Sequence, residues 1–252
     1  MAPTASRLLI PFMFLAALAS CKEEPKENNA VIPVPKLEND CYDWWQRHEA
    51  VLAAKGKIDP EIVLIGDSIT HYWGGEPQSP GAPRRGPKSW EDVFGGKKVL
   101  NLGFGWDRTQ NVLWRLGNGE IDGLEPKWIV LNIGTNNSTG TQNARENTPA
   151  ETAAGVEAIL TLLKEKTPDS KVILMGVFPR GTKANDPARA FISELNSLLA
   201  KIAQAHQLTF IDLREKFLDG DGKLRSELMA DVVHPAESGY AVWAEALKAE
   251  IK

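Results

Sequence analysis

Short apolar runs recur along the chain and alternate with segments whose apolar residues have helical spacing. The five runs are rich in Val and Ile, and they cover residues 62–65, 99–102, 128–133, 172–178 and 210–213. Their apolar residues follow one another without polar alternation, which is typical of strands that are covered on both faces. Helical spacing predicts helices that include residues 156–163, 191–202 and 238–251. The alternation therefore predicts an α/β fold with a five-stranded parallel sheet between layers of helices.

The loops that follow the strands are where this fold class binds ligands, beyond the carboxyl ends of the strands. The first strand is followed by the segment GDSIT at residues 66–70. Ser68 would lie where the strand turns into a helix, next to free backbone N–H groups, so its hydroxyl is well placed to act as a nucleophile. The segment is not the nucleophile elbow of α/β-hydrolases, because Thr70 stands where that motif has its second glycine. If this segment is considered alone, Ser68 could instead be a helix cap without a catalytic role.

Two further strand-end loops carry glycine and asparagine. Residues 101–107 are NLGFGWD, which contains G-x-G but lacks the third glycine of a dinucleotide-binding fingerprint. Residues 134–137 are GTNN. Because asparagines often form turns, Asn136 alone is compatible with a turn or with a functional side-chain amide.

Near the C-terminus, Asp231 precedes His234 by three residues in the segment DVVHP. At this spacing the carboxylate can accept a hydrogen bond from the histidine Nδ1–H, which fixes the tautomer and stabilises the imidazolium. The two side chains could instead bind a metal ion, but the strand-end loops supply no obvious third and fourth ligand. We therefore predict no metal ion and no other cofactor.

Composition and charge exclude several other classes of protein. The chain has 252 residues, of which 42% are hydrophobic and 25% are charged, and this excludes a disordered, collagen-like or multi-span membrane protein. The net charge of -4 gives no electrostatic footprint for nucleic acid. Two cysteines alone make neither a disulfide framework nor a four-ligand zinc site.

The N-terminal 40 residues carry targeting signals and a linker. Residues 1–20 combine one arginine with an uncharged apolar run too short for a stable membrane span, as in a secretory signal peptide. The run ends in LASC, which resembles a bacterial lipobox and predicts lipidation of Cys21; a plain signal peptide is the alternative. Residues 21–40 predict a flexible tether, because prolines, charges and amides bury little apolar surface.

This organisation places the globular domain at residues 41–252, with Cys41 as a buried, inert thiol. It also predicts an extracytoplasmic protein of the bacterial cell envelope. Contact with the membrane would then be made through the lipid anchor alone.

The four loops together resemble the four conserved sequence blocks of the SGNH (GDSL-type) hydrolase superfamily. In order, these blocks carry Ser in GDS, Gly in the second block (here residues 101–107), Asn in GTNN and His in DxxHP. Within the superfamily, the chain is most similar to the catalytic subunits of the intracellular platelet-activating-factor acetylhydrolases, from about residue 62 to the C-terminus. The similar segments include residues 111–120, 178–181 and 221–240. The resemblance implies a flavodoxin-like three-layer sandwich and ester hydrolysis without a metal ion.

The resemblance also implies a role for each matching residue. Ser68 would be the nucleophile, His234 the general base and then the general acid, and Asp231 the carboxylate that orients the histidine. The oxyanion hole would combine the backbone N–H of Ser68, a backbone N–H of the second block and the side-chain amide of Asn136.

Two departures from the family pattern concern the surroundings of the site. Trp106 stands where the family has the donor glycine, so the backbone N–H is kept while an indole would line the pocket; the N–H of Gly105 is the alternative donor. Residues 71–98 form an insert that is longer than in the acetylhydrolase subunits and is expected to shape the substrate pocket. The residues assigned to the pocket are Trp73, Trp90 and Arg180. For the tryptophans, packing beneath long loops is the alternative.

We therefore expect a serine esterase that removes small acyl groups, chiefly acetyl, from a small ester or an acylated carbohydrate. The surface location and the loop tryptophans favour a carbohydrate. A lysophospholipase or thioesterase acting on longer acyl chains is the rival enzyme, but the Pro, Gly and Arg content of the insert does not favour an apolar groove. The third interpretation is a non-catalytic surface carbohydrate-binding protein, against which the complete Ser, Asp, His and Asn blocks argue.

Overall fold

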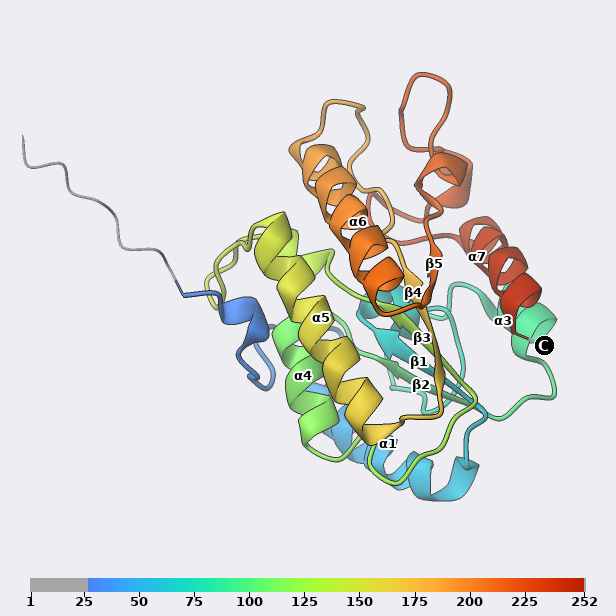
Figure 1. Ribbon diagram of the computed structural model, residues 1–252. Helices are drawn as coiled ribbons and strands as arrows, with labels where there is room; N and C mark the ends of the chain where they lie inside the picture. Colours follow the sequence, from blue (N-terminus) through green and yellow to red (C-terminus); the bar gives the residue numbers. More distant parts are fainter. Residues whose placement is uncertain (1–26, 252) are drawn as a thin grey trace, which may run out of the picture.

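Five parallel strands form one sheet in the computed structural model, which describes residues 27–251 (Figure 1). Their order in the sheet is β2-β1-β3-β4-β5, the flavodoxin-like arrangement. The strands are β1 (Ile62–Gly66), β2 (Val99–Gly103), β3 (Trp128–Asn132), β4 (Lys171–Met175) and β5 (Thr209–Ile211). All five predicted strands are present, which confirms the predicted three-layer α/β fold.

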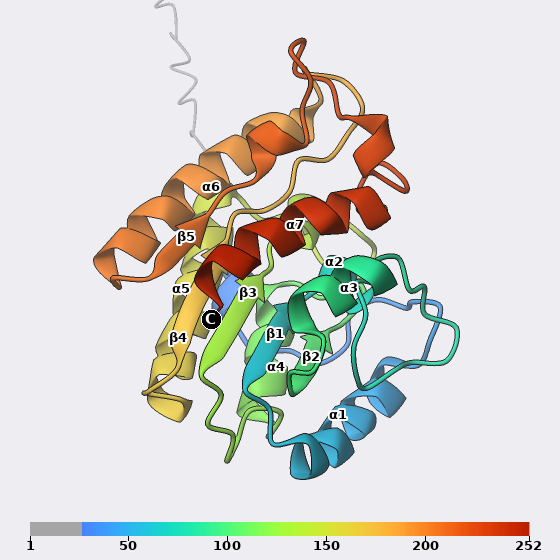
Figure 2. The same cartoon turned by 90° about the vertical axis from the view of Figure 1, so that its right-hand side faces the viewer.

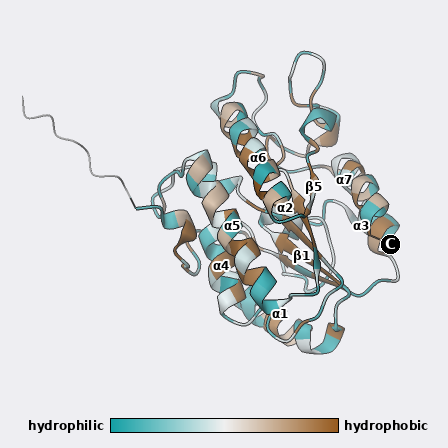
Figure 3. Ribbon diagram, viewed as in Figure 1, coloured by the Kyte–Doolittle hydropathy of each residue, from teal (hydrophilic) through white to brown (hydrophobic). Residues whose placement is uncertain are grey.

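Helices cover both faces of the sheet because successive strand residues point to opposite faces. Val63 and Ile65 belong to the apolar core on one face, whereas Ile62 and Leu64 belong to the core on the other. Figure 3 shows the hydrophobic strands of the sheet between the helices. The first face is covered by α1 (Trp44–Ile58), α4 (Thr109–Gly117), α5 (Pro149–Lys166) and α6 (Pro187–Ala205).

The second face is covered by two helices that lie side by side, α3 (Pro87–Phe94) and α7 (Glu237–Glu250) (Figure 2). The short α2 (Ser68–His71) follows β1 directly. Four 3-10 turns complete the described elements: η1 (Asn29–Val31), η2 (Asn136–Ser138), η3 (Arg214–Lys216) and η4 (Ser226–Leu228). Within residues 27–251, no helix combines the length and apolar character needed to cross a membrane.

The insert between α2 and β2 packs onto the sheet, and its tryptophans are core residues. Trp73 is fully buried, with its ring centroid 4.5 Å from that of Trp243 and 5.5 Å from that of Tyr240 in α7. Trp90 of α3 is partly buried and meets Trp73 edge-on at 5.9 Å. The assignment of Trp73 and Trp90 to a substrate pocket is therefore wrong, because both rings cover the apolar face of the sheet.

The segment before α1 is docked on the domain, contrary to the prediction of a flexible tether through residue 40. Ala30 of η1 is fully buried between α4 and α5. Farther along the segment, Asn111 of α4 donates through Nδ2 to the carbonyl of Pro35 at 2.6 Å. The domain therefore begins near residue 28. The predicted signal peptide and Cys21 lie outside the described residues.

Cys41 is exposed, so the prediction of a buried thiol is also wrong. The pKa of this thiol is nevertheless raised above its ordinary value by partial desolvation and by the neighbouring Asp40 carboxylate. Its reactive thiolate form is correspondingly disfavoured.

The docking of η1 predicts an unusual response to alanine in α5. A Cβ at Gly155 would lie 2.7 Å from the carbonyl oxygen of Ala30 and 2.5 Å from Oγ1 of Thr109, which donates to that same carbonyl. Glycine to alanine in a helix normally stabilises by about 0.5–1 kcal/mol. Here we expect Gly155→Ala to lower the free energy of unfolding by ~1–3 kcal/mol in urea titrations, because overpacking displaces η1.

The matched control is Gly56→Ala in α1, where a Cβ meets nothing within 4 Å. This variant should be as stable as the wild type or more so. A Gly155→Ala protein that gains stability like Gly56→Ala would contradict the docking of residues 28–40.

Candidate active site

Three side chains from distant parts of the chain form a hydrogen-bonded series at the carboxyl edge of the sheet. Oγ of Ser68 lies 2.9 Å from Nε2 of His234, and Nδ1 of His234 lies 2.9 Å from Oδ2 of Asp231. Ser68 lies two residues after the end of β1, whereas Asp231 and His234 lie between η4 and α7. The structure thus brings together the serine, the histidine and the carboxylate that the sequence singled out.

Ser68 reaches this position because the backbone turns sharply after β1. A Cβ at Gly66 would collide with Oγ1 of Thr70 and with the carbonyl oxygen of Asn132, so only glycine fits there. Asp67 then caps α2 by accepting the Ile69 N–H through Oδ1 at 2.9 Å. The serine therefore opens α2, where backbone N–H groups have no partner within the helix.

The Asp231 carboxylate determines how protons are arranged on His234. Its Oδ1 also accepts the backbone N–H groups of Val233 and His234, at 2.9 and 2.8 Å, which fixes it beside the ring. With Nδ1–H donating to the carboxylate, the neutral imidazole presents its Nε2 lone pair to the Ser68 hydroxyl. Burial holds the pKa of His234 below its ordinary value, although the Asp231 charge opposes this shift. His234 is therefore neutral near pH 7 and suited to accept the serine proton.

Hydrogen-bond donors also lie near Ser68, in the loops that follow β2 and β3. Asn136 donates through Nδ2 to the carbonyl of Asp107 at 2.9 Å, which leaves the second amide hydrogen for a ligand. The Gly105 N–H donates to Oη of Tyr42 at 2.5 Å, whereas the Trp106 N–H has no acceptor anywhere in residues 27–251. This pattern favours Trp106 over Gly105 as the backbone donor.

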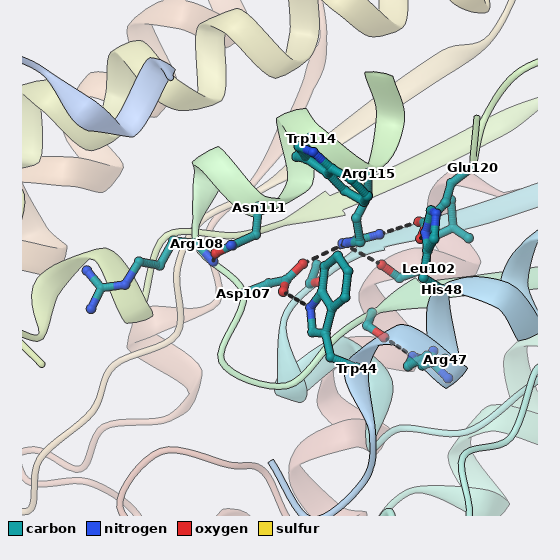
Figure 4. A network of polar contacts seen from close by, with 12 residues as sticks. Trp44, Arg47, His48, Leu102, Asp107, Arg108, Asn111, Trp114, Arg115 and Glu120 are labelled. Atoms are coloured by element: carbon teal, nitrogen blue, oxygen red, sulfur yellow. Dashed lines mark hydrogen bonds and ion pairs between the residues drawn. The ribbon is translucent and has the colours of Figure 1, made fainter. Parts of the chain in front are cut away.

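A buried network of charges lies beneath the loop that carries Trp106 (Figure 4). Arg115 of α4 is fully buried, and its guanidinium donates to Asp107 at 2.7 Å and also to Glu120. Trp44 donates to the second Asp107 oxygen at 2.8 Å. Because the Asp107 carbonyl is the acceptor for Asn136, this network holds both the loop and the amide in place.

A small pocket of about 120 Å³ opens beside Ser68. Arg180, which the sequence assigned to the pocket, is half-buried in its wall and donates to the Thr135 carbonyl at 3.2 Å. The residues that line the pocket are Ser68, Tyr72, Trp106, Asn136, Arg180, Val233 and His234. Tyr72 and Val233 were missed, although Tyr72 could have been found, because residues four apart share one face of a helix.

Three charged or polar groups near the site were also missed by the sequence analysis. Arg85 of the insert donates to Oδ2 of Asp231 at 2.8 Å. Asp40, in the segment before α1, accepts the Tyr72 hydroxyl at 2.9 Å. Burial raises the pKa of Asp67 to about 7, and Oδ2 of this carboxyl has no partner in the described part of the chain. No sequence pattern signals these contacts, since each depends on how separate loops meet.

Within residues 27–251, no group of three or more His, Cys, Asp or Glu side chains is arranged to hold a metal ion. A base that contacts a serine hydroxyl can activate it as a nucleophile, and nearby hydrogen-bond donors can stabilise the oxyanion that forms. Such a site can transfer an acyl group through the serine oxygen.

Similar proteins are known over most of the length of the chain. Residues 64–242 match the model of the GDSL-like lipase/acylhydrolase family. The platelet-activating factor acetylhydrolase IB subunit alpha2 of Homo sapiens is 34% identical over 217 residues, which cover 85% of this chain and 86% of that protein. For the alpha1 subunit of Homo sapiens the values are 31% over 225 residues, with 88% and 89% covered.

Solved structures of similar fold include two bacterial proteins. A GDSL-like lipase from Bacteroides thetaiotaomicron superposes with a TM-score of 0.61 and 24% identity, covering 81% of this chain and 95% of that one. A catalytic mutant of an acetylxylan esterase from Geobacillus stearothermophilus gives a TM-score of 0.60 and 22% identity, covering 76% and 94%. At these identities the likeness establishes a common fold.

The backbone of Trp106 yields a prediction about strain. Its φ of 64° is in the left-handed region, where a side chain other than glycine costs about 1–2 kcal/mol. Trp106→Gly and Trp106→Ala both remove the indole, but only glycine relieves the backbone. We expect the glycine variant to be more stable than the alanine variant by about 1 kcal/mol in urea unfolding. Equal stability of the two variants would argue against a left-handed residue 106.

Proposed function

The chain belongs to the GDSL-like lipase/acylhydrolase family and is a carboxylic ester hydrolase, and we propose that it removes small acyl groups, chiefly acetyl, from carbohydrate esters. The observation that carries this proposal is the series Ser68–His234–Asp231, which opens onto a pocket of about 120 Å³.

In the proposed mechanism, Ser68 forms an acyl-enzyme. Its Oγ attacks the ester carbonyl carbon while Nε2 of His234 accepts the hydroxyl proton, and Asp231 stabilises the imidazolium that results. When the C–O bond to the alcohol breaks, His234 returns the proton to the leaving oxygen. A water molecule then attacks the acyl-serine with its proton passing to His234, and breakdown restores Ser68 and releases the carboxylic acid.

The negative charge that develops on the carbonyl oxygen would be met by three donors. They are the backbone N–H groups of Ser68 and Trp106 and the free amide hydrogen of Asn136. A single donor of this kind contributes ~2.7–4 kcal/mol to stabilisation of the transition state. The lack of a protein acceptor for the Trp106 N–H supports its part in this hole.

The small size of the pocket supports a small acyl group. A volume of about 120 Å³ is well below the ~300–1,000 Å³ of pockets that hold drug-sized ligands, so the pocket suits a small acyl group. The names of the similar alpha2 subunit and of the acetylxylan esterase also specify acetyl esters.

Two features support a carbohydrate as the alcohol. Trp106 is 41% exposed at the pocket, so its indole offers a flat apolar surface to a sugar ring. If Cys21 is lipidated as the sequence predicts, the domain would also be held at the cell surface, among polysaccharides.

The proposal predicts a strong dependence on acyl length. For p-nitrophenyl acetate, butyrate, octanoate and palmitate, we expect kcat/KM to be highest for acetate and to fall at least about tenfold by octanoate, because the pocket excludes added methylenes. Acetate should also be released from acetylated xylo-oligosaccharides. Ser68→Ala is the control for background hydrolysis in both assays.

Other outcomes would identify the rival functions. A maximum at octanoate or palmitate would indicate a lysophospholipase or thioesterase. Binding of acetylated oligosaccharides without hydrolysis of any ester would indicate a carbohydrate-binding protein.

A further inference from the structure

Arg85 belongs to the insert, yet it contacts the carboxylate of the Ser68–His234–Asp231 series. Its Nη1 lies 2.8 Å from Oδ2 of Asp231, and the two side chains are 25% and 40% exposed. The preceding Arg84 is exposed and makes no hydrogen bond or ion pair within residues 27–251. Two adjacent arginines of the insert therefore differ sharply in their surroundings.

The backbone around Arg85 is fixed, so the contact does not depend on the side chain alone. The Arg85 N–H donates to the Tyr72 carbonyl at 2.7 Å, and the next N–H, of Gly86, donates to the Trp73 carbonyl at 3.2 Å. The guanidinium carbon lies 5.6 Å from the centroid of the Tyr72 ring, at cation–π distance. Since Tyr72 is the C-cap residue of α2, these contacts link Arg85 to the short helix that begins with Ser68.

The two oxygens of Asp231 have different partners. Oδ1 accepts the backbone N–H groups of Val233 and His234, whereas Oδ2 accepts Arg85. Both oxygens lie within 3.0 Å of Nδ1 of His234. The backbone and the guanidinium thus hold the carboxylate through different oxygens, within hydrogen-bond distance of Nδ1.

We propose that Arg85 is a positioning residue, which holds Asp231 against His234 and favours the neutral imidazole that accepts the Ser68 proton. The inference rests on the proposed function in treating His234 as the base.

Electrostatics supports the second part of this role. Asp231 and Asp40 carry negative charges that favour the imidazolium of His234, while the Arg85 charge disfavours it. The Tyr72 ring, 5.2 Å from the imidazole ring, is neutral, because burial and Asp40 raise the pKa of its hydroxyl. Loss of the Arg85 charge should therefore raise the pKa of His234.

The test is an NMR titration of the histidine ring signals in the full chain. The His234 signal is identified by its loss in His234→Asn, and melting curves that match the wild type show that each variant is folded. Arg85→Gln should raise the pKa of His234 by about 0.5–1 unit, a modest shift because water screens this partly exposed pair. Arg84→Gln, the matched control, should leave it unchanged. Arg85→Lys keeps the charge and should recover part of the shift.

Kinetics should follow the same shift. In Arg85→Gln the acid limb of the kcat/KM profile for p-nitrophenyl acetate should move up by the same amount, a loss of about 3- to 10-fold on that limb. At pH values above both pKa values the profiles should converge toward that of the wild type.

The outcomes separate this inference from the proposed function. A His234 pKa that is unchanged or lower in Arg85→Gln, or that rises equally in Arg84→Gln, would overturn the role of Arg85. If the His234 pKa rises as expected in Arg85→Gln but the wild-type protein releases no acetate from any ester, the role of Arg85 is supported and the proposed function is refuted.

Discussion

The geometry of the site depends on the ion pairs that the buried guanidinium of Arg115 makes. This guanidinium joins the buried Asp107 and Glu120 side chains, so removing one partner would leave an unpaired buried charge, at a cost of about 3–5 kcal/mol. The carbonyl of the same Asp107 accepts Asn136. Arg115 therefore fixes the loop after β2 relative to the loop after β3. A serine enzyme needs such rigidity, because its donors stabilise charge only if they are in place before the reaction.

The topology of the sheet explains why these loops meet. Ser68, Trp106 and Asn136 follow β1, β2 and β3, and β1 lies between the other two strands. Parallel strands bring their carboxyl ends to one edge of the sheet, so the three loops that follow them meet there. His234 and Asp231 come from the segment before α7, whose aromatic residues pack against Trp73 and so anchor this segment to the same edge. The ends of three strands and the segment before one helix thus carry every group of the proposed mechanism.

The sequence predicted the strands and the histidine–carboxylate pair because both depend on local patterns. Continuous apolar runs are buried strands in any α/β protein, and an Asp three residues before a His can reach its ring without knowledge of the fold. Trp73 could not be placed in the same way, because its partners Trp243 and Tyr240 are far away in the sequence. The docking of residues 28–40 was missed for a related reason: their composition suggests disorder, but α4 and α5 supply a surface that buries Ala30. The contact between Arg85 and Asp231 was missed for the same reason, because it joins loops that are far apart in the sequence.

The central claim is that Ser68 carries the acyl group during turnover. The most direct measurement is mass spectrometry of the protein quenched in acid during hydrolysis of p-nitrophenyl acetate, followed by mapping of the acetylated peptide. The account predicts one acetyl group on Ser68 of the wild type and no acetylated peptide from the Ser68→Ala protein. Steady hydrolysis with the acetyl group on another residue, or undiminished turnover by the Ser68→Ala protein, would contradict it.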